Sequence, residues 1–270
     1  MAWTKVIPAH PVVAVAGATG AVGNEFLKVL HDLNFPASEV RALASARSAG
    51  KKLPFEGCGD VPAGELTVQE MTSESFDGVD IALFSAGASV SKEMREAVTA
   101  AGAVMIDNSS AFRMDEDVPL VVPEVNPGDV SWHNGVIANP NCSTIQMVVA
   151  LKPLHDAAGI RRVVVSTYQA VSGAGKGGID ELEAEVKAPA GTPAPCKVFP
   201  YPIAYNLIPQ IGGFNDEGYT SEEMKMQNEG RKMLHDDNLL VSCTCVRVPI
   251  IRSHSEALTI EFENEISPEE

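Results

Sequence analysis

Near the N-terminus, the chain has an apolar run, Pro11–Ala16, that leads directly into the glycine-rich turn Gly17–Gly23. Such a run without alternation is typical of a parallel strand buried on both faces. The helical pattern of Phe26, Leu27 and Leu30 follows the turn. Strand, turn and helix predict a dinucleotide site with the pyrophosphate at the helix N-terminus. Because the spacing is GxxGxxG rather than GxGxxG, the flanking elements support the prediction more than the glycines do. The candidate cofactor-binding residues are Gly17, Thr19, Gly20, Ala21, Val22 and Gly23.

The second predicted strand, residues 40–44, indicates which dinucleotide is bound. An NAD site usually places Asp or Glu at this strand end to hold the ribose hydroxyls. This chain has Arg47 between Ser45 and Ser48 instead, a pattern that suits a 2′-phosphate. The alternative is a solvated surface arginine. We therefore predict NADP rather than NAD.

Strand and helix continue to alternate, with strands at residues 80–84 and 104–107 and a helix at 91–101. Ligands of open α/β sheets bind at the carboxyl ends of the parallel strands. We therefore expect the residues at those ends to face one crevice; they are Ser85, Gly87, Asn108 and Arg113. The alternation stops near Ala138, which predicts an α/β, Rossmann-like NADP-binding domain over residues 1–137.

Residues 139–144, with the sequence NPNCST, join a short strand to a helical pattern, and Ser143 or Thr144 is the expected helix cap. Cys142 would then lie at a helix N-terminus, where backbone N–H groups favour an anion. Such a setting lowers the pKa of a thiol from about 8.5. It would also stabilise an oxyanion on an acyl group bonded to the sulfur. We interpret Cys142 as a candidate nucleophile; the alternative is a small core residue.

The remainder predicts a second domain over residues 138–270, α+β in class with a mostly antiparallel or mixed sheet. Strands are expected at 162–169, 239–248 and 258–263, and a polar helix at 221–234. The glycine-rich loop at 170–178 fails as a P-loop because Gly177 stands where Ser or Thr is required. Residues 188–202 are rich in Pro and Ala and predict an irregular connection. The i,i+3 spacing of Glu222 and Lys225 by itself indicates only a surface ion pair. A lone histidine such as His254 is more often a solvated or core residue than a catalyst.

Composition narrows the classes of partner. A net charge of −16 argues against nucleic acid and against an anionic membrane surface. The five cysteines form no CxxC pair, so we expect neither a disulfide framework nor a metal site. No run approaches the ~20 apolar residues of a membrane-spanning helix. A reducing cytoplasm is the expected location.

Seven ordered segments resemble aspartate-β-semialdehyde dehydrogenases, most closely the bacterial branch. They are GATGAVG at 17–23, SARS at 45–48, SSAFR at 109–113, NPNCST at 139–144, STYQAVSGAG at 166–175, EEMK at 222–225 and RVPIIRSHSE at 247–256. The resemblance implies NADPH-dependent reductive dephosphorylation of L-aspartyl-4-phosphate to the semialdehyde through a cysteine thioester. This reaction belongs to the pathway to lysine, threonine, methionine and isoleucine. It also implies a homodimer or a dimer of dimers.

The resemblance assigns roles to individual residues. Cys142 is the acyl-accepting nucleophile, His254 the acid/base, and Gln169 orients the acyl intermediate. Arg247 holds the substrate α-carboxylate, and Glu222 binds the substrate amine or pairs with Lys225. The implied phosphate-binding residues are Arg113 and Lys225, with Asn108 and Asn141 nearby. Ser172 and Gly173 join the cofactor-binding set.

Two other enzyme families and one non-enzyme class compete with this prediction. N-acetyl-γ-glutamyl-phosphate reductase shares the fold and the thioester logic, but its cysteine usually lies in a Gly–Cys–Tyr setting, unlike Asn141–Cys142–Ser143 here. Glyceraldehyde-3-phosphate dehydrogenase matches the cysteine motif less well. A non-catalytic nucleotide-binding paralogue would not need to keep Cys142, Gln169, Arg247 and His254 together.

Relatives continue past the strand ending near Glu265, so we expect the second domain to be incomplete at its C-terminus.

Overall fold

The computed structural model describes residues 3–189, 191–193 and 195–269. The chain forms two compact units. The first contains the chain up to Val121 together with Pro127–Pro140, and the second contains Val122–Asn126 and the chain from Asn141 onward. Within the described residues, no helix is long and apolar enough to cross a membrane.

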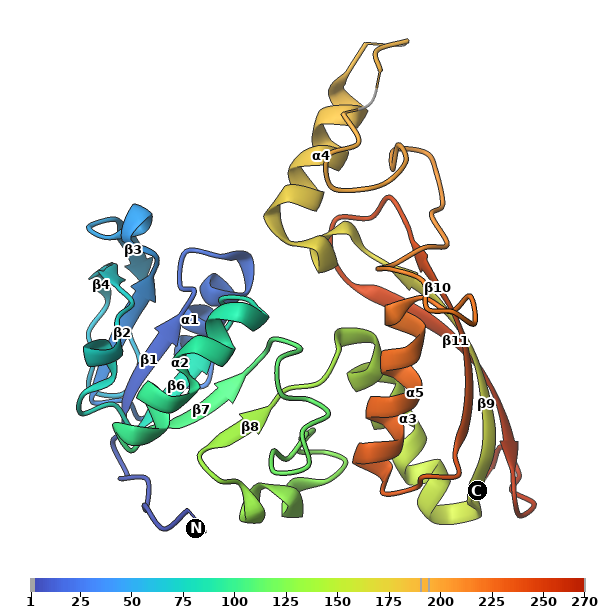
Figure 1. Ribbon diagram of the computed structural model, residues 1–270, viewed down its shortest axis with the longest axis horizontal. Helices are drawn as coiled ribbons and strands as arrows, with labels where there is room; N and C mark the ends of the chain where they lie inside the picture. Colours follow the sequence, from blue (N-terminus) through green and yellow to red (C-terminus); the bar gives the residue numbers. More distant parts are fainter. Residues whose placement is uncertain (1–2, 190, 194, 270) are drawn as a thin grey trace. The chain divides into compact units, whose positions relative to one another are not determined.

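The first unit is built on a six-stranded parallel sheet in the order β5-β2-β1-β6-β7-β8 (Figure 1). Its main elements are β1 (Val12–Ala16), α1 (Ala21–Asp32), β2 (Glu39–Ala44), β5 (Gln69–Glu70), β6 (Ile81–Phe84), α2 (Ala88–Ala100), β7 (Val104–Asp107) and β8 (Val136–Ala138). The strand order reverses beside β1, so the carboxyl ends of β1 and β6 flank the crevice where such sheets bind ligands. This is the Rossmann-like arrangement that the sequence predicts.

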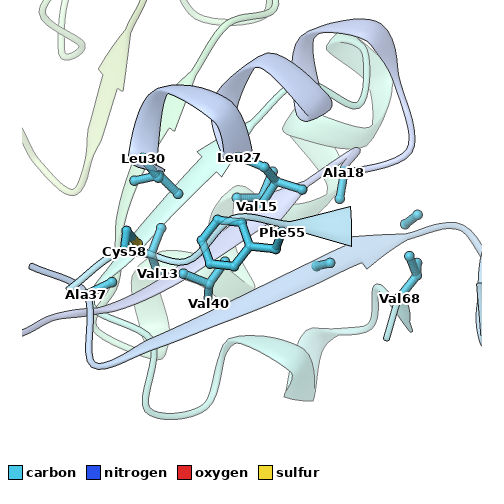
Figure 2. Packing of buried hydrophobic residues seen from close by; sticks show 12 residues of the cluster. Val13, Val15, Ala18, Leu27, Leu30, Ala37, Val40, Phe55, Cys58 and Val68 are labelled. Atoms are coloured by element: carbon cyan, nitrogen blue, oxygen red, sulfur yellow. The ribbon is translucent and has the colours of Figure 1, made fainter. Parts of the chain in front are cut away.

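The core of this unit joins α1 to the sheet (Figure 2). Leu27 and Leu30 of α1 pack in one buried cluster with Val13 and Val15 of β1. Burial of each such side chain stabilises the fold by roughly 1.5–3 kcal/mol. The cluster also contains Phe55, the last residue of β3 (Lys52–Phe55). This strand pairs antiparallel with β4 (Gly64–Thr67), and the sequence analysis predicts neither strand. Short 3₁₀ turns complete the unit: η1 (Ala46–Ser48), η2 (Ser73–Phe76) and η3 (Pro127–Trp132).

The second unit holds a three-stranded mixed sheet, as predicted. Its elements are α3 (Cys142–Ala158), β9 (Ile160–Gln169), η4 (Val171–Ala174), α4 (Gly175–Lys187), α5 (Ser221–Leu234), β10 (Leu240–Arg247) and β11 (His254–Phe262). The central strand β9 runs parallel to β10 and antiparallel to β11. The helices α3 and α5 lie side by side against this sheet (Figure 1). Along β9, Val163 and Val165 are buried while Val164 and Tyr168 are exposed, so one face of the sheet is left open.

The structure corrects two local predictions in this unit. The loop predicted at 170–178 ends early, because its last four residues form the first turn of α4. Glycine disfavours helix, but the buried Leu182 packs α4 against Val171 and Phe199, and this tertiary packing outweighs local propensity. The last strand, expected over residues 258–263, begins four residues earlier, so that His254 is the first residue of β11. The predicted irregular connection at 188–202 contains residues 190 and 194, which lie outside the described residues.

Candidate active site

The carboxyl end of β1 meets α1 in a turn that requires glycine. Gly17 has φ +86°, and a Cβ on it would collide with the Ser85 carbonyl. A Cβ on Gly23 would collide with the Gly17 carbonyl, so α1 starts close to the turn. Its N-cap, Gly20, offers no side chain to the first-turn amides, and the first turn has no acidic residue. Thr19 precedes this cap, and Ala21 and Val22 open the helix. A helix start of this kind suits a phosphate group.

The end of β2 lies next to this turn because β2 pairs with β1. Arg47 and Ser45 are exposed there, whereas Ser48 is 8% exposed and its hydroxyl accepts a hydrogen bond from Lys51 Nζ at 3.3 Å. Arg47 forms no ion pair with any residue that the structure describes. Sequence reasoning missed Lys51, which adds a second positive charge at this strand end.

A second polar cluster lies at the carboxyl ends of β6, β7 and β8. Asn108 Oδ1 accepts from Asn139 Nδ2 at 2.7 Å, and Asn108 Nδ2 donates to Ser85 Oγ at 3.5 Å. Arg113, 8% exposed, donates from Nε to the Asn139 carbonyl at 2.9 Å and from Nη2 to the Asn108 carbonyl at 3.0 Å. Ser85, Asn108 and Arg113 therefore lie together, while Gly87 caps α2 with φ +91°. Asn139, which is not among the predicted site residues, connects this cluster through its side chain and its carbonyl.

Cys142 is the first residue of α3, and its side chain is exposed. Its Sγ lies 3.2 Å from Nε2 of His254. The first turn of α3 contains no acidic residue, so the helix end keeps its preference for a negative charge. The structure therefore brings together the thiol and the imidazole that the sequence separates by 112 positions.

Asn141, not Ser143 or Thr144, caps α3. Its Oδ1 accepts from the backbone N–H groups of Ser143 at 3.0 Å and Thr144 at 3.2 Å. The expectation of a later cap is wrong because Asn141 has an extended backbone, with ψ 141°, and the helix begins at the next residue. The backbone of Asn141 is fixed as well, because its N–H donates to Glu229 Oε2 at 2.6 Å.

Glu222 of α5 connects three candidate site residues. Its Oε1 accepts from Asn141 Nδ2 at 2.9 Å and from Gln169 Nε2 at 3.0 Å, and its Oε2 lies 3.0 Å from Lys225 Nζ. Glu222 is 6% exposed, so its pair with Lys225 is not a simple surface ion pair. Burial raises the pKa of Glu222, but Lys225 and the hydrogen bonds from Asn141 and Gln169 outweigh burial and hold that pKa below its usual value.

Arg247 ends β10 and is 6% exposed. Its Nη1 donates to the Ala170 carbonyl at 2.7 Å. A Cβ on Gly173 would lie 2.8 Å from the same Nη1, so the glycine leaves room for the guanidinium. Burial lowers the pKa of Arg247, and the nearby Glu222 and Cys142 act against that shift. Ser172 is half-buried beside Gly173 in η4.

Sequence reasoning missed Glu229 and Ala170. Glu229 follows Glu222 by seven residues, a spacing that places two residues on one face of a helix, and this signal was available. Ala170 contributes through its peptide group, which residue type does not reveal. Among the described residues, no group of three or more His, Cys, Asp or Glu side chains is placed to hold a metal ion.

Comparison with known proteins now identifies the family. The model of the semialdehyde dehydrogenase NAD binding domain matches residues 12–133, and that of the semialdehyde dehydrogenase dimerisation domain matches residues 151–270. An aspartate-semialdehyde dehydrogenase from Aquifex aeolicus (strain VF5) is 57% identical over 263 residues, which cover 96% of this chain and 76% of the relative. The chain belongs to the aspartate-semialdehyde dehydrogenase family. A second member, from Bacillus subtilis (strain 168), is 53% identical over 261 residues, covering 94% of this chain and 74% of its own length.

Solved structures of the aspartate-semialdehyde dehydrogenase family share the fold. The crystal structure of aspartate semialdehyde dehydrogenase II from Vibrio cholerae, complexed with ASA, matches with a TM-score of 0.92 and 48% identity, covering 97% of this chain and 77% of the other. The Candida albicans enzyme with NADP matches with a TM-score of 0.70 and 28% identity, covering 96% of this chain and 73% of the other.

Proposed function

We propose that the chain is an NADP-dependent oxidoreductase that interconverts L-aspartyl-4-phosphate and L-aspartate-4-semialdehyde through a thioester on Cys142. The observation that carries this proposal is the thiol–imidazole pair, with 3.2 Å between Cys142 Sγ and His254 Nε2, in a member of this family. A relative of known structure is complexed with ASA, and another contains NADP.

Cys142 performs the covalent chemistry. Its thiolate attacks the acyl carbon of the aspartyl phosphate, a C–S bond forms, and the C–O bond to phosphate breaks with its electron pair leaving on phosphate. Splitting one difficult step into two easier ones is the advantage of covalent catalysis. NADPH, when bound, supplies the hydride that reduces the thioester. The thiolate then leaves as the aldehyde forms.

The buried side chains around the thiol position the substrate. Arg247 presents a guanidinium that binds both oxygens of the α-carboxylate at once. Gln169 is fixed by its bond to Glu222 and orients the acyl group. Glu222 already pairs with Lys225. The substrate amine therefore binds a carboxylate that is part of an ion pair, and the phosphate binds the lysine of the same pair. Arg113, fixed through Asn108 and Asn139, is the second phosphate-binding cation.

The first unit fits NADP. The uncapped start of α1 offers backbone amides to the pyrophosphate, and the close contact of Gly17 with Ser85 leaves the turn free of side chains. The 2′-phosphate is bound by the side chains of Ser45, Arg47 and Ser48. The candidate residues after β6 and β9 belong to the same proposed set: Ser85, Gly87, Ser172 and Gly173.

We place the self-association of the proposed homodimer on the open face of the sheet in the second unit, the part matched by the dimerisation domain. Val164 and Tyr168 are each 45% exposed there, and Leu240 of β10 is 51% exposed. A cytoplasmic location belongs to the same proposal, because a catalytic thiol must stay reduced.

The decisive assay follows NADPH formation from NADP, L-aspartate semialdehyde and phosphate, with phosphate omitted as the control. We expect turnover that requires all three. N-acetylglutamate semialdehyde in place of the aspartate compound tests the sister family. Turnover with N-acetylglutamate semialdehyde but not with L-aspartate semialdehyde would overturn the proposed substrate.

A further inference from the structure

Glu229 of α5 accepts a hydrogen bond from the backbone of the residue that precedes the nucleophile. Its Oε2 lies 2.6 Å from the backbone nitrogen of Asn141, which is a short distance for an N–H···O bond. Glu229 is 2% exposed and Asn141 is 5% exposed, so water does not compete for this bond. None of the site roles described above involves Glu229.

This bond completes the cap of α3 from a different helix. In a capping box the N-cap side chain bonds the amide of the third helical residue, and a Glu or Gln at that third position bonds back to the N-cap N–H. α5 has such a box of its own, formed by Thr220 and Glu223. In α3 the third residue is Thr144, whose amide donates to Asn141 Oδ1 but whose side chain has no carboxyl to return the bond. Glu229 supplies that returning bond.

α5 holds Asn141 at two separate points. Glu222 Oε1 accepts from the side-chain Nδ2 of Asn141 at 2.9 Å, while Glu229 Oε2 accepts from its backbone N–H. At 1.5 Å per residue, the two glutamates lie about 10 Å apart along the helix axis. Asn141 therefore cannot turn about either bond without breaking the other. The peptide that leads into Cys142 is left with one orientation.

The two helices approach each other closely at this level, which makes α5 a rigid support. A Cβ on Gly230, the residue after Glu229, would lie 3.3 Å from Cε of Met147 in α3. Met147 is fully buried. A group that positions a reacting atom is effective only when packing fixes its own place.

We propose that Glu229 is a positioning residue for the nucleophile, which acts through the Asn141 peptide to keep Cys142 Sγ beside His254 Nε2. The imidazole takes the thiol proton only at hydrogen-bond distance, and the observed separation is 3.2 Å. The amides at the start of α3 likewise stabilise the thiolate only while the first residue keeps its place. The inference rests on the proposed function for the reaction, but not for the ionisation of the thiol.

A positioning role and a role through charge predict shifts of opposite sign. A negative charge near a thiol raises the pKa of the thiol, so removal of Glu229 as a charge would lower the pKa of Cys142. Removal of Glu229 as a support moves the sulfur away from the groups that stabilise the thiolate. The pKa of Cys142 would then rise.

The pH dependence of alkylation by iodoacetamide, without substrate, measures this shift. Mass spectrometry of the peptide that contains Cys142 gives its rate, and Cys196, which is also exposed, is the internal control. Glu229→Gln keeps an acceptor oxygen at full reach, Glu229→Asp keeps the charge on a shorter side chain, and Glu229→Met has neither.

We expect the ionisation midpoint of Cys142 to rise by about one pH unit in the aspartate and methionine variants, because the helix start and its neighbours lower a thiol pKa by that much or more. The glutamine variant should show no rise, and the rate at Cys196 should not change. An equal rise in the glutamine and aspartate variants, or a fall in the methionine variant, would overturn the inference. If the methionine variant does not fold, the aspartate and glutamine variants decide.

Met147→Ala is the matched control for loosened packing of α3 and α5. It opens a cavity between the helices but leaves both bonds to Asn141 in place. We expect a lower melting temperature and an unchanged midpoint at Cys142. A midpoint shift as large as that of Glu229→Asp would attribute the effect to packing and overturn the inference.

The NADP-linked assay adds a kinetic readout. A displacement of ~1 Å costs on the order of 10²-fold in rate, so kcat of Glu229→Asp should fall by about that factor and kcat of Glu229→Gln by much less. Wild-type kcat in the aspartate variant would overturn the inference. If the unmodified chain shows no turnover, the proposed function fails, while alkylation still decides the role of Glu229.

Discussion

Two helices of this chain begin beside candidate ligand sites, and they begin differently. α1 starts at Gly20, which has no side chain to bond the first-turn amides. α3 starts at Asn141, whose side chain accepts from two first-turn amides and donates to the buried Glu222. A side-chain cap is worth about 1 kcal/mol. α1 forgoes that stabilisation and leaves its amides for a ligand, whereas α3 uses it to fix its own first residue, Cys142.

The difference extends to the arginines of the two regions. Arg47 is exposed and belongs to the region built from backbone and glycine, whereas Arg247 is 6% exposed and belongs to a network of buried side chains. Changes in the first region should act through cofactor affinity and depend on salt. Changes in the second should act on the chemical step and depend little on salt.

Loss of the nucleophile gives the largest effect. Cys142→Ala should lower turnover by at least ~10⁴-fold, as removal of a covalent nucleophile does in other enzymes. NADP affinity, measured by calorimetric titration, should not change, because the start of α1 lies in the other unit. Cys142→Ser is expected to keep a trace of activity. Near wild-type turnover of the alanine variant would remove Cys142 from the mechanism.

Arg247→Lys comes next, although it conserves charge. The lysine lacks the paired donors that bind a carboxylate, and a misplacement of ~1 Å costs on the order of 10²-fold in rate. We expect a raised KM for the semialdehyde, a lower kcat and unchanged NADP affinity. Gly173→Ala, which crowds the same guanidinium, should move the KM in the same direction. If Arg247 is only structural, the melting temperature falls and the KM stays constant.

Capping α1 should close the cofactor site. In Gly20→Asp the carboxylate bonds the first-turn amides and repels the pyrophosphate, so NADP affinity should fall ~10-fold or more. Gly20→Ala is the matched control, since both variants place a Cβ 3.2 Å from the Gly17 carbonyl oxygen. The alkylation rate of Cys142 should be unchanged in both. An equal loss of NADP affinity in the alanine variant would attribute the effect to crowding rather than to the cap.

Arg47→Glu should weaken NADP by about 10-fold and NAD much less, because it replaces a phosphate partner by a like charge. The preference of the wild type for NADP should decrease as salt is raised. Dissociation constants of both cofactors at two salt concentrations provide the measurement. Equal weakening of NAD and NADP would mean that Arg47 does not contact the 2′-phosphate.

The smallest effect concerns the carboxyl of Glu256, of which one oxygen is buried without a hydrogen-bond partner among the described residues. Burial raises the pKa of Glu256 to about 7, and a hydrogen bond from Gln146 acts against that shift. The folded chain therefore keeps a proton that the unfolded chain has lost. Stability should fall as pH rises from 4.5 to about 7, by at most ~1.4 kcal/mol per pH unit.

Thermal melting across this pH range tests the prediction, with Glu256→Gln expected to remove the slope. Glu222 provides the contrast. Because its folded pKa is lowered, its contribution to stability is present above the unfolded pKa and is lost as pH falls through the folded value. A slope that survives in Glu256→Gln would assign the titration to another group.

The sequence predicts the parallel sheet well because buried parallel strands are continuous apolar runs, as in β1, β6 and most of β7, and β2 departs from that pattern at Glu39 and Arg41. It does not reveal α4, because the glycines of its first turn disfavour a helix. Only the tertiary packing of Leu182 with Phe199 and Val171 stabilises it. The thiol and the imidazole are recognisable through their motifs. The bonds from Asn141 to Glu222 and Glu229 depend on how α3 and α5 pack. The spacing of the two glutamates shows only that they share one face of a helix, not which residue that face meets.

The peptide group of Ala170 makes two bonds: its N–H donates to Nδ1 of His254 at 2.9 Å, and its carbonyl accepts from Nη1 of Arg247 at 2.7 Å. These two bonds have a consequence for genetics. An alanine scan leaves this position untouched, and most substitutions there alter a side chain rather than the peptide that carries the two bonds. Deletion of one residue between Gln169 and Ser172 should be far more damaging, because it shifts the amide away from His254 and the carbonyl away from Arg247 at once. Tolerance to substitution at a position is thus a poor guide to its importance when the backbone performs the task.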